Sequence, residues 1–263
     1  MRMPGFMFVI MALSAQAAFA QDPGRPGEVR LLPGHLLDNG QYLAGVEISL
    51  APGWKTYWRM PGEGGIPPVF DWSGSSNVSG ATVEWPVPRV FDTYGLRSLG
   101  YYDLVVFPVL FDIDDAGADA DLVLSLSYGL CSDICIPAEA RAAIRAPLAE
   151  VRNADLLAEA RAATTEAAEG ISARCAIVPA AGAWRLDALV SGAGPLAPAT
   201  VAVFEAPDPD LWIGTPDAVM QEDGLLFSAP MDWFGDGAFA LSRADVRITL
   251  IDSGRSAVEL TGC

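Results

Sequence analysis

The sequence predicts a mainly β protein with two β-domains joined by a helix, and three patterns along the chain predict it. Residues 21–148 contain runs in which apolar and polar residues alternate, as in half-buried antiparallel strands. Residues 149–170 are alanine-rich and weakly amphipathic, which is typical of a connecting helix. Alternation then returns in 171–263, a second, smaller β-sandwich-like domain. Several short strands without a helical period favour an immunoglobulin-like antiparallel β-sandwich for the first domain.

The predicted elements are separated by clusters of turn-forming Gly, Pro, Asp and Ser residues. Strands of the first domain are predicted at 46–50, 55–58, 69–72, 81–87, 105–111, 122–128 and 140–145. The helix is predicted to begin after Asn153, a capping residue, and to stop at Gly170. Strands of the second domain are predicted at 174–178, 184–190, 200–205, 224–228, 246–251 and 257–261.

The N-terminus has the layout of a secretory signal peptide. Arg2 precedes an apolar run over residues 6–13, and small residues follow at the predicted cleavage site after Ala20. Neither this run nor any later one reaches the roughly 20 apolar residues that a membrane-spanning helix requires. We therefore expect residues 1–20 to be removed and the product to be exported without spanning the membrane, into a compartment where disulfides persist.

Composition limits the chemistry of the chain. It has 33 acidic against 16 basic residues and a net charge of −17, which disfavours binding to nucleic acid or anionic lipid surfaces. Lys55 is the only lysine and His35 the only histidine, so histidine-based catalytic triads and histidine-rich zinc sites are excluded. No cofactor and no metal site is predicted. Chemistry must come from carboxylates, the backbone or the four cysteines.

Cys175 and Cys263 lie at the beginning and at the end of the second domain, and we predict a structural disulfide between them. Closing so long a loop contributes about 4–5 kcal/mol in the chain-entropy model. The alternative is a free C-terminal thiol that pairs with another chain.

Cys131 and Cys135 present a different case, because four extended residues would separate their Cα atoms by roughly 13 Å. A disulfide needs about 4.4–6.8 Å, so the chain must turn back as a hairpin tip or a single helical turn. A bridge that closes so small a loop adds little to the stability of the fold, and such weak stabilisation is typical of an exchangeable disulfide. The alternative is a structural disulfide that stabilises only this loop.

The loop itself contains Asp133 and Glu139 but no base before Arg141, so nearby charge does not strongly activate the thiols. We therefore expect the oxidised pair to be the electrophile that a partner's thiolate attacks. Elsewhere in the first domain, Trp54, Tyr57 and Trp58 lie on or beside a strand. They either fill the core or shield the cysteine loop and dock clients.

Two other functions fit the same residues. The cysteine pair could bind Cu(I) through two soft thiolates, with His35 as a third ligand, in a copper-tolerance protein. Alternatively, the chain is a non-catalytic adaptor in which both disulfides are structural.

An ordered series of motifs resembles the N-terminal periplasmic domain of DsbD-type protein-disulfide reductases, and more closely its ScsB-like variants. The resemblance covers about residues 31–144. The motifs are GWKTYWRMPG at 53–62, GGIPP at 64–68, FDW at 70–72, EWPVP at 84–88, YG at 94–95, GY at 100–101 and YGLCSDICIPAE at 128–139.

This resemblance implies an immunoglobulin-like domain whose redox-active pair is Cys131 and Cys135. In such proteins the pair takes electrons from a membrane-embedded thiol transporter of the DsbD or CcdA type. It passes them to periplasmic clients, either disulfide isomerases or thioredoxin-like proteins serving cytochrome c maturation. The best-known members have five residues between the cysteines, whereas this chain has three. Because the membrane relay and the thioredoxin-like part are missing from this sequence, we expect a stand-alone periplasmic shuttle or a domain that has lost its electron source.

Overall fold

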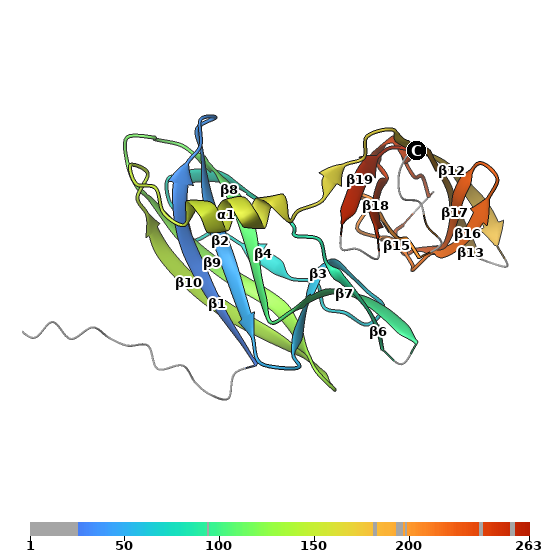
Figure 1. The fold of residues 1–263 in the computed structure, drawn as a ribbon, viewed down its shortest axis with the longest axis horizontal. Helices are drawn as coiled ribbons and strands as arrows, with labels where there is room; N and C mark the ends of the chain where they lie inside the picture. The colour runs from blue at the N-terminus through green and yellow to red at the C-terminus, as the bar shows by residue number, and fades with distance from the viewer. Residues whose placement is uncertain are drawn as a thin grey trace, which may run out of the picture.

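The structure, a computed structural model, describes residues 26–93, 95–180, 183–192, 197, 199–236, 239–252 and 256–263. Two β-sandwiches are joined by the helix α1 (Figure 1), so the predicted mainly β, immunoglobulin-like architecture is confirmed. The predicted signal peptide and its cleavage site after Ala20 lie outside the described residues. Within these ranges, no helix combines the length and apolar character needed to cross a membrane.

The first domain packs a four-stranded sheet against a six-stranded one, and every strand pairing in it is antiparallel. The smaller sheet has the order β1-β2-β8-β5, with β1 at Gly27–Leu36, β2 at Gln41–Leu50, β5 at Val78–Val83 and β8 at Leu104–Ile113. The larger has the order β10-β9-β3-β7-β6, with β3 at Lys55–Gly62, β6 at Arg89–Thr93, β7 at Leu96–Tyr102, β9 at Ala120–Cys131 and β10 at Cys135–Ala146. The short strand β4, Val69–Asp71, also pairs with β9.

Aromatic side chains fill the space between these sheets. Phe107, fully buried on β8, makes edge-to-face contacts with the rings of Trp85 and Tyr101 at 5.4 and 5.3 Å. Trp85 lies in the stretch predicted as a strand over 81–87. That strand ends earlier, at Val83, because the chain leaves the sheet there to pack Trp85 on the core.

The connecting helix is shorter than predicted for 149–170. It spans Ala154–Ala162 as α1, and residues Glu166–Ala167 instead form β11, which pairs in parallel with a strand of the second domain. Asn153 precedes the helix without a side-chain cap, since its amide donates to the carbonyl of Pro33. The fully buried Leu157 packs with Leu43 and Val106, so α1 lies against the outer face of the smaller sheet (Figure 1).

The second domain is another two-layer sandwich. One sheet has the order β11-β19-β18-β14, with β14 at Val201–Glu205, β18 at Arg247–Ile251 and β19 at Ala257–Thr261. The other sheet has the order β12-β13-β17-β15, and β16 also pairs with β17. Its strands are β12 at Ile171–Ala180, β13 at Ala183–Gly192, β15 at Leu211–Ile213, β16 at Asp217–Gln221 and β17 at Gly224–Trp233. A single 3₁₀ turn, η1, at Arg243–Asp245 precedes β18.

A disulfide joins Cys175 to Cys263 with their Cα atoms 5.2 Å apart. Cys175 lies on β12 and Cys263 follows β19, so the bridge connects the two sheets of the second domain instead of neighbouring strands of one sheet. Both cysteines pack against the domain's apolar core.

Arg59 of β3 joins the two domains. Its guanidinium donates to Glu205 on β14 at 2.8 Å and to Glu259 on β19 at 2.6 Å. It also lies over the ring of Trp58 at 4.2 Å, and its side chain is only 13% exposed. The strand that carries Arg59 is also the strand that borders the cysteine pair, so the second domain is anchored close to that site.

Candidate redox site

The cysteine pair lies at the tip of a hairpin formed by β9 and β10. Cys131 and Cys135 are direct partners across the two strands, and their sulfurs form a disulfide. The three residues between them are exposed, and the backbone of Ser132 donates to Ile134 at 3.1 Å. The sequence left open whether the loop is a hairpin tip or a single helical turn, and the structure shows a hairpin tip.

The two sulfurs of this bridge differ in accessibility. Cys131 is 5% exposed, whereas Cys135 is an exposed residue. Attack on a disulfide requires access to the sulfur under attack. Of the two cysteines, Cys135 is therefore the one that a thiolate of another protein can approach more easily.

Tyr57 is the aromatic residue that touches the pair. Its hydroxyl lies 3.1 Å from Sγ of Cys135, and its side chain is otherwise buried, which raises the pKa of the phenol. The ring fits beside Gly129 on β9, where an added Cβ would approach the ring to 2.8 Å and also Ile66 to 2.8 Å. Glycine at this position thus leaves room for the ring, whose hydroxyl reaches the sulfur of Cys135.

The other two aromatics, expected either to fill the core or to shield the cysteine loop, pack in or against the core. Trp58 is completely buried in the core of the first domain. Trp54 is half-buried and packs against the same core. Of the three aromatic side chains, Tyr57 is the one that contacts the disulfide.

Replacing Tyr57 by Phe tests the contribution of this hydroxyl. Hydrogen bonds to charged groups contribute about 1.5–3 kcal/mol, so losing the donor should raise the pKa of the Cys135 thiol in the reduced protein by about one to two units. The pH dependence of the thiolate's ultraviolet absorbance measures this in a variant that retains Cys135 but has serine at 131. An unchanged Cys135 pKa in a normally folded Tyr57→Phe protein would show that the hydroxyl does not serve the thiolate.

The structure places one further residue, Lys55, opposite the pair, although it lies far from the cysteine loop in the sequence. Lys55 on β3 is the direct partner of Cys131 on β9. Its position could not be deduced from the cysteine motif, because 76 positions separate the two in the sequence. The available signal was that the chain's only lysine lies in a stretch predicted as a strand.

His35 is not brought near the cysteines. It lies on β1 opposite Leu43, in the sheet that does not contain Cys131 and Cys135. In the part of the chain that the structure describes, no group of three or more His, Cys, Asp and Glu side chains is arranged to hold a metal ion.

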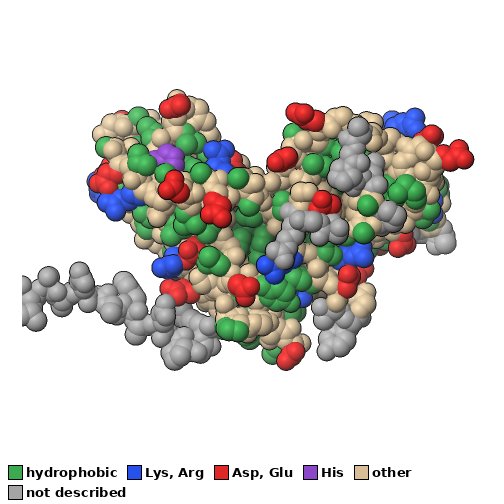
Figure 2. Space-filling model, in the orientation of Figure 1, with side chains coloured by type: hydrophobic (Ala, Val, Ile, Leu, Met, Phe, Trp, Pro, Cys, Tyr) green, Lys and Arg blue, Asp and Glu red, His purple; other side chains and the backbone are tan. Residues whose placement is uncertain are grey.

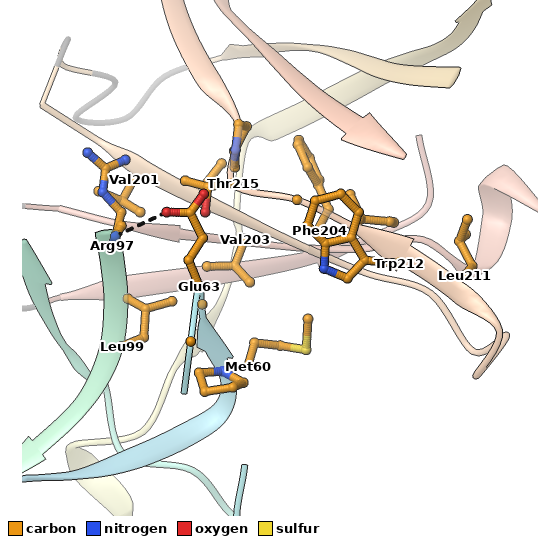
Figure 3. Close-up of a pocket in the computed structure, with 17 residues that line it drawn as sticks. Met60, Glu63, Arg97, Leu99, Val201, Val203, Phe204, Leu211, Trp212 and Thr215 are labelled. Carbon is orange, nitrogen blue, oxygen red and sulfur yellow. Dashed lines mark hydrogen bonds between the residues drawn. The ribbon is translucent and has the colours of Figure 1, made fainter. Parts of the chain in front are cut away.

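A cavity of about 480 Å³ lies between the two domains (Figure 3). Met60 and Leu99 of the first domain line it together with Phe204 and Trp212 of the second, and Glu63 accepts a hydrogen bond from the backbone of Arg97 at its edge. The domains are thus incompletely packed next to the Arg59 ion pairs, while Val203, Ile251 and Ala257 of the second domain pack with the apolar core of the first.

An accessible disulfide at the tip of an immunoglobulin-like sandwich defines a thiol–disulfide interchange type of domain. Residues 29–147 match the family described as thiol:disulfide interchange protein DsbD, N-terminal. The resemblance found in the sequence motifs is confirmed.

The fold of the whole described chain also has a solved counterpart. The crystal structure of the N-terminal periplasmic domain of ScsB from Proteus mirabilis matches with a TM-score of 0.65 and 24% identity, over 89% of this chain and 90% of that one. The likeness extends through the second sandwich. No curated protein matches the chain.

Proposed function

We propose that this chain is a periplasmic thiol–disulfide interchange module of the protein-disulfide reductase type. It passes electrons through Cys131 and Cys135 between a membrane-embedded thiol relay and periplasmic clients, which are thioredoxin-like proteins or disulfide isomerases. The family match of the first domain and the periplasmic origin of the similar ScsB domain support the class of reaction and the compartment.

The observation that carries this proposal is the contrast between the two disulfides. Cys135 is exposed at a hairpin tip, whereas Cys175 is 7% exposed and Cys263 packs against the core of the second domain. The first bridge joins cysteines that are 4 positions apart in the sequence, and the second joins cysteines that are 88 positions apart. Chain entropy therefore stabilises the second bridge much more than the first, and access favours exchange at the first.

The reaction requires no cofactor. A donor thiolate attacks Sγ of Cys135, a mixed disulfide forms, and the electron pair of the broken bond stays on the sulfur of Cys131. A second donor thiolate then attacks the donor's own sulfur in the mixed disulfide, which closes the donor's disulfide and releases Cys135 as a thiolate. Two electrons have passed to the pair, and the reverse sequence passes them to a client.

A partner has to bind this chain although the chain is strongly acidic. Acidic side chains are spread over both domains (Figure 2), in agreement with the net charge of −17. At the tip itself Ile134 is 67% exposed beside the reactive sulfur. An apolar residue in this position provides a contact for the surface of a docked client, where apolar residues are common at the centre of interfaces.

Selective reduction tests the proposal. With increasing reductant, mass-spectrometric disulfide mapping should find Cys131–Cys135 opened while Cys175–Cys263 remains closed. The potential of the first bridge should lie above about −300 mV, the value below which structural disulfides usually fall. If both bridges open together below that value, the chain is an adaptor with two structural disulfides and the proposal fails.

A further inference from the structure

We propose that the ammonium group of Lys55 stabilises the thiolate that Cys131 becomes when a partner opens the bridge at Cys135. This inference deepens the proposed function and rests on it. It assigns a positioning role to a residue on a strand remote in sequence from the cysteine motif.

The sheet places Lys55 opposite Cys131, and in the structure its ammonium contacts β7 and β6, on the other side of β3 from β9. On β3, Lys55 is the direct partner of Cys131 on β9 and also of Tyr102 on β7. Directly opposed residues project from the same face of a sheet, with Cβ atoms about 4.5–5.5 Å apart. The long, flexible side chain of a lysine spans that distance, so its ammonium can turn toward Cys131.

Among the residues that the structure describes, the ammonium of Lys55 has no acidic partner. The residue is 6% exposed, and Nζ is held by Ser98 Oγ at 3.3 Å and lies 5.0 Å from the centre of the Phe91 ring. Among the described residues it forms no ion pair, although the chain has twice as many acids as bases. Burial is the one cause that shifts the pKa of Lys55, and it lowers it.

A buried cation without a counter-ion is costly, and an apolar side chain would fill the same space without that cost. The cost is offset if an anion forms beside the ammonium during the reaction. The anion supplied by the proposed reaction is the thiolate of Cys131, which is itself nearly inaccessible to water. An adjacent positive charge lowers the pKa of a thiol, and a sulfur of lower pKa leaves faster.

Other titratable and charged groups on this face do not replace Lys55. Tyr57 on the same strand has its hydroxyl at Cys135, and Tyr102 on β7 carries a phenol and no cationic group. On β6, Arg89 shares the face of Phe91 but is exposed. Lys55 is therefore the buried cation that lies directly opposite Cys131 in the sheet.

The single lysine makes a direct experiment possible in the full chain. With isotopically labelled lysine, the only ε-carbon signal in a nuclear magnetic resonance spectrum reports the titration of Lys55. We expect chemical reduction of the wild-type Cys131–Cys135 bridge to raise the pKa of Lys55 by about one unit, a tenfold change in its acid dissociation, because the new thiolate favours the charged amine. An identical titration before and after reduction would overturn the proposal.

Two matched variants identify the sulfur. The rise should be present in Cys135→Ser, which keeps Cys131 as a free thiol, and absent in Cys131→Ser, which keeps Cys135. The opposite result would assign the ammonium to Cys135 and would overturn the role proposed here. These titrations use no partner protein, so they remain decisive even if exchange with a client is not found.

The reciprocal measurement uses the cysteine. In the Cys135→Ser background, Lys55→Met should reduce the thiolate fraction of Cys131 about tenfold at a pH below its pKa, and Lys55→Arg should restore most of it. If Lys55→Met leaves the thiolate fraction unchanged while the protein keeps its unfolding transition, Lys55 only packs against Phe91 and Ser98.

Discussion

The variant Cys131→Ser is expected to accumulate a mixed disulfide with a thioredoxin-like partner, and Cys135→Ser is expected to form almost none. The reason is the difference in access, because Cys135 is exposed and Cys131 is 5% exposed. With serine at position 131 no internal thiol resolves the mixed disulfide formed at Cys135. Non-reducing electrophoresis followed by mass spectrometry of the cross-linked peptides measures the yield of each variant.

Both single variants are expected to abolish electron transfer, so the trapped species is the informative readout. A suitable control is Cys175→Ser combined with Cys263→Ser, which removes the other bridge and should leave exchange at the hairpin tip in place. Equal trapping by the two single variants would contradict the view that only Cys135 is attacked. It would mean that the tip opens before a partner binds and exposes Cys131 as well.

How far the sequence predicted the fold depends on how many faces of each strand are buried. Strands β8 and β9 follow the alternation of apolar residues at 105–111 and 122–128. Strand β1 was not predicted, because Pro33 and Gly34 interrupt its pattern where its register with β2 shifts. Strand β7 was also not predicted, since four consecutive residues from Ser98 are buried and no alternation remains to be seen.

The site was predictable only where its residues are close in the sequence. Spacing and compartment indicated that Cys131 and Cys135 form a bridge on a turn. The contact of Tyr57 with Cys135 depends on the pairing of β3 with β9, which short-range patterns do not encode. That pairing is fixed by Lys55 opposite Cys131 and by the buried hydroxyl of Thr56, which donates to the carbonyl of Gly129 at 2.9 Å.

Replacing Arg59 by Met is expected to loosen the second domain from the first and to lower the free energy of unfolding by about 2–3 kcal/mol. Removing one partner of a buried ion pair costs about 3–5 kcal/mol, because the remaining charge is left without compensation. Here the cost is smaller, since Glu205 and Glu259 remain 16% and 26% exposed and Arg247 approaches them at 4.0 and 3.4 Å. Denaturant unfolding measures the loss, and small-angle scattering should show an increased radius of gyration.

Arg152→Met is the matched control, because Arg152 pairs with Glu150 and both side chains are more than half exposed. Exposed pairs contribute about 0–1 kcal/mol, so this control should change neither the unfolding free energy nor the scattering noticeably. If Arg59→Met behaves like the control, the apolar contacts around Met60 and Phe204 hold the domains together and the ion pairs add little.

A double-mutant cycle separates the two explanations. The coupling energy between Arg59→Met and Glu205→Gln should be positive and about 1–3 kcal/mol if the guanidinium and the carboxylate interact directly, and near zero if each acts only through packing. Because Tyr57 lies two residues before Arg59 on β3, the reduction potential of Cys131–Cys135 should be measured in the same variants. An unchanged potential alongside a loosened second domain would show that the second sandwich positions clients and leaves the chemistry of the pair to the first domain.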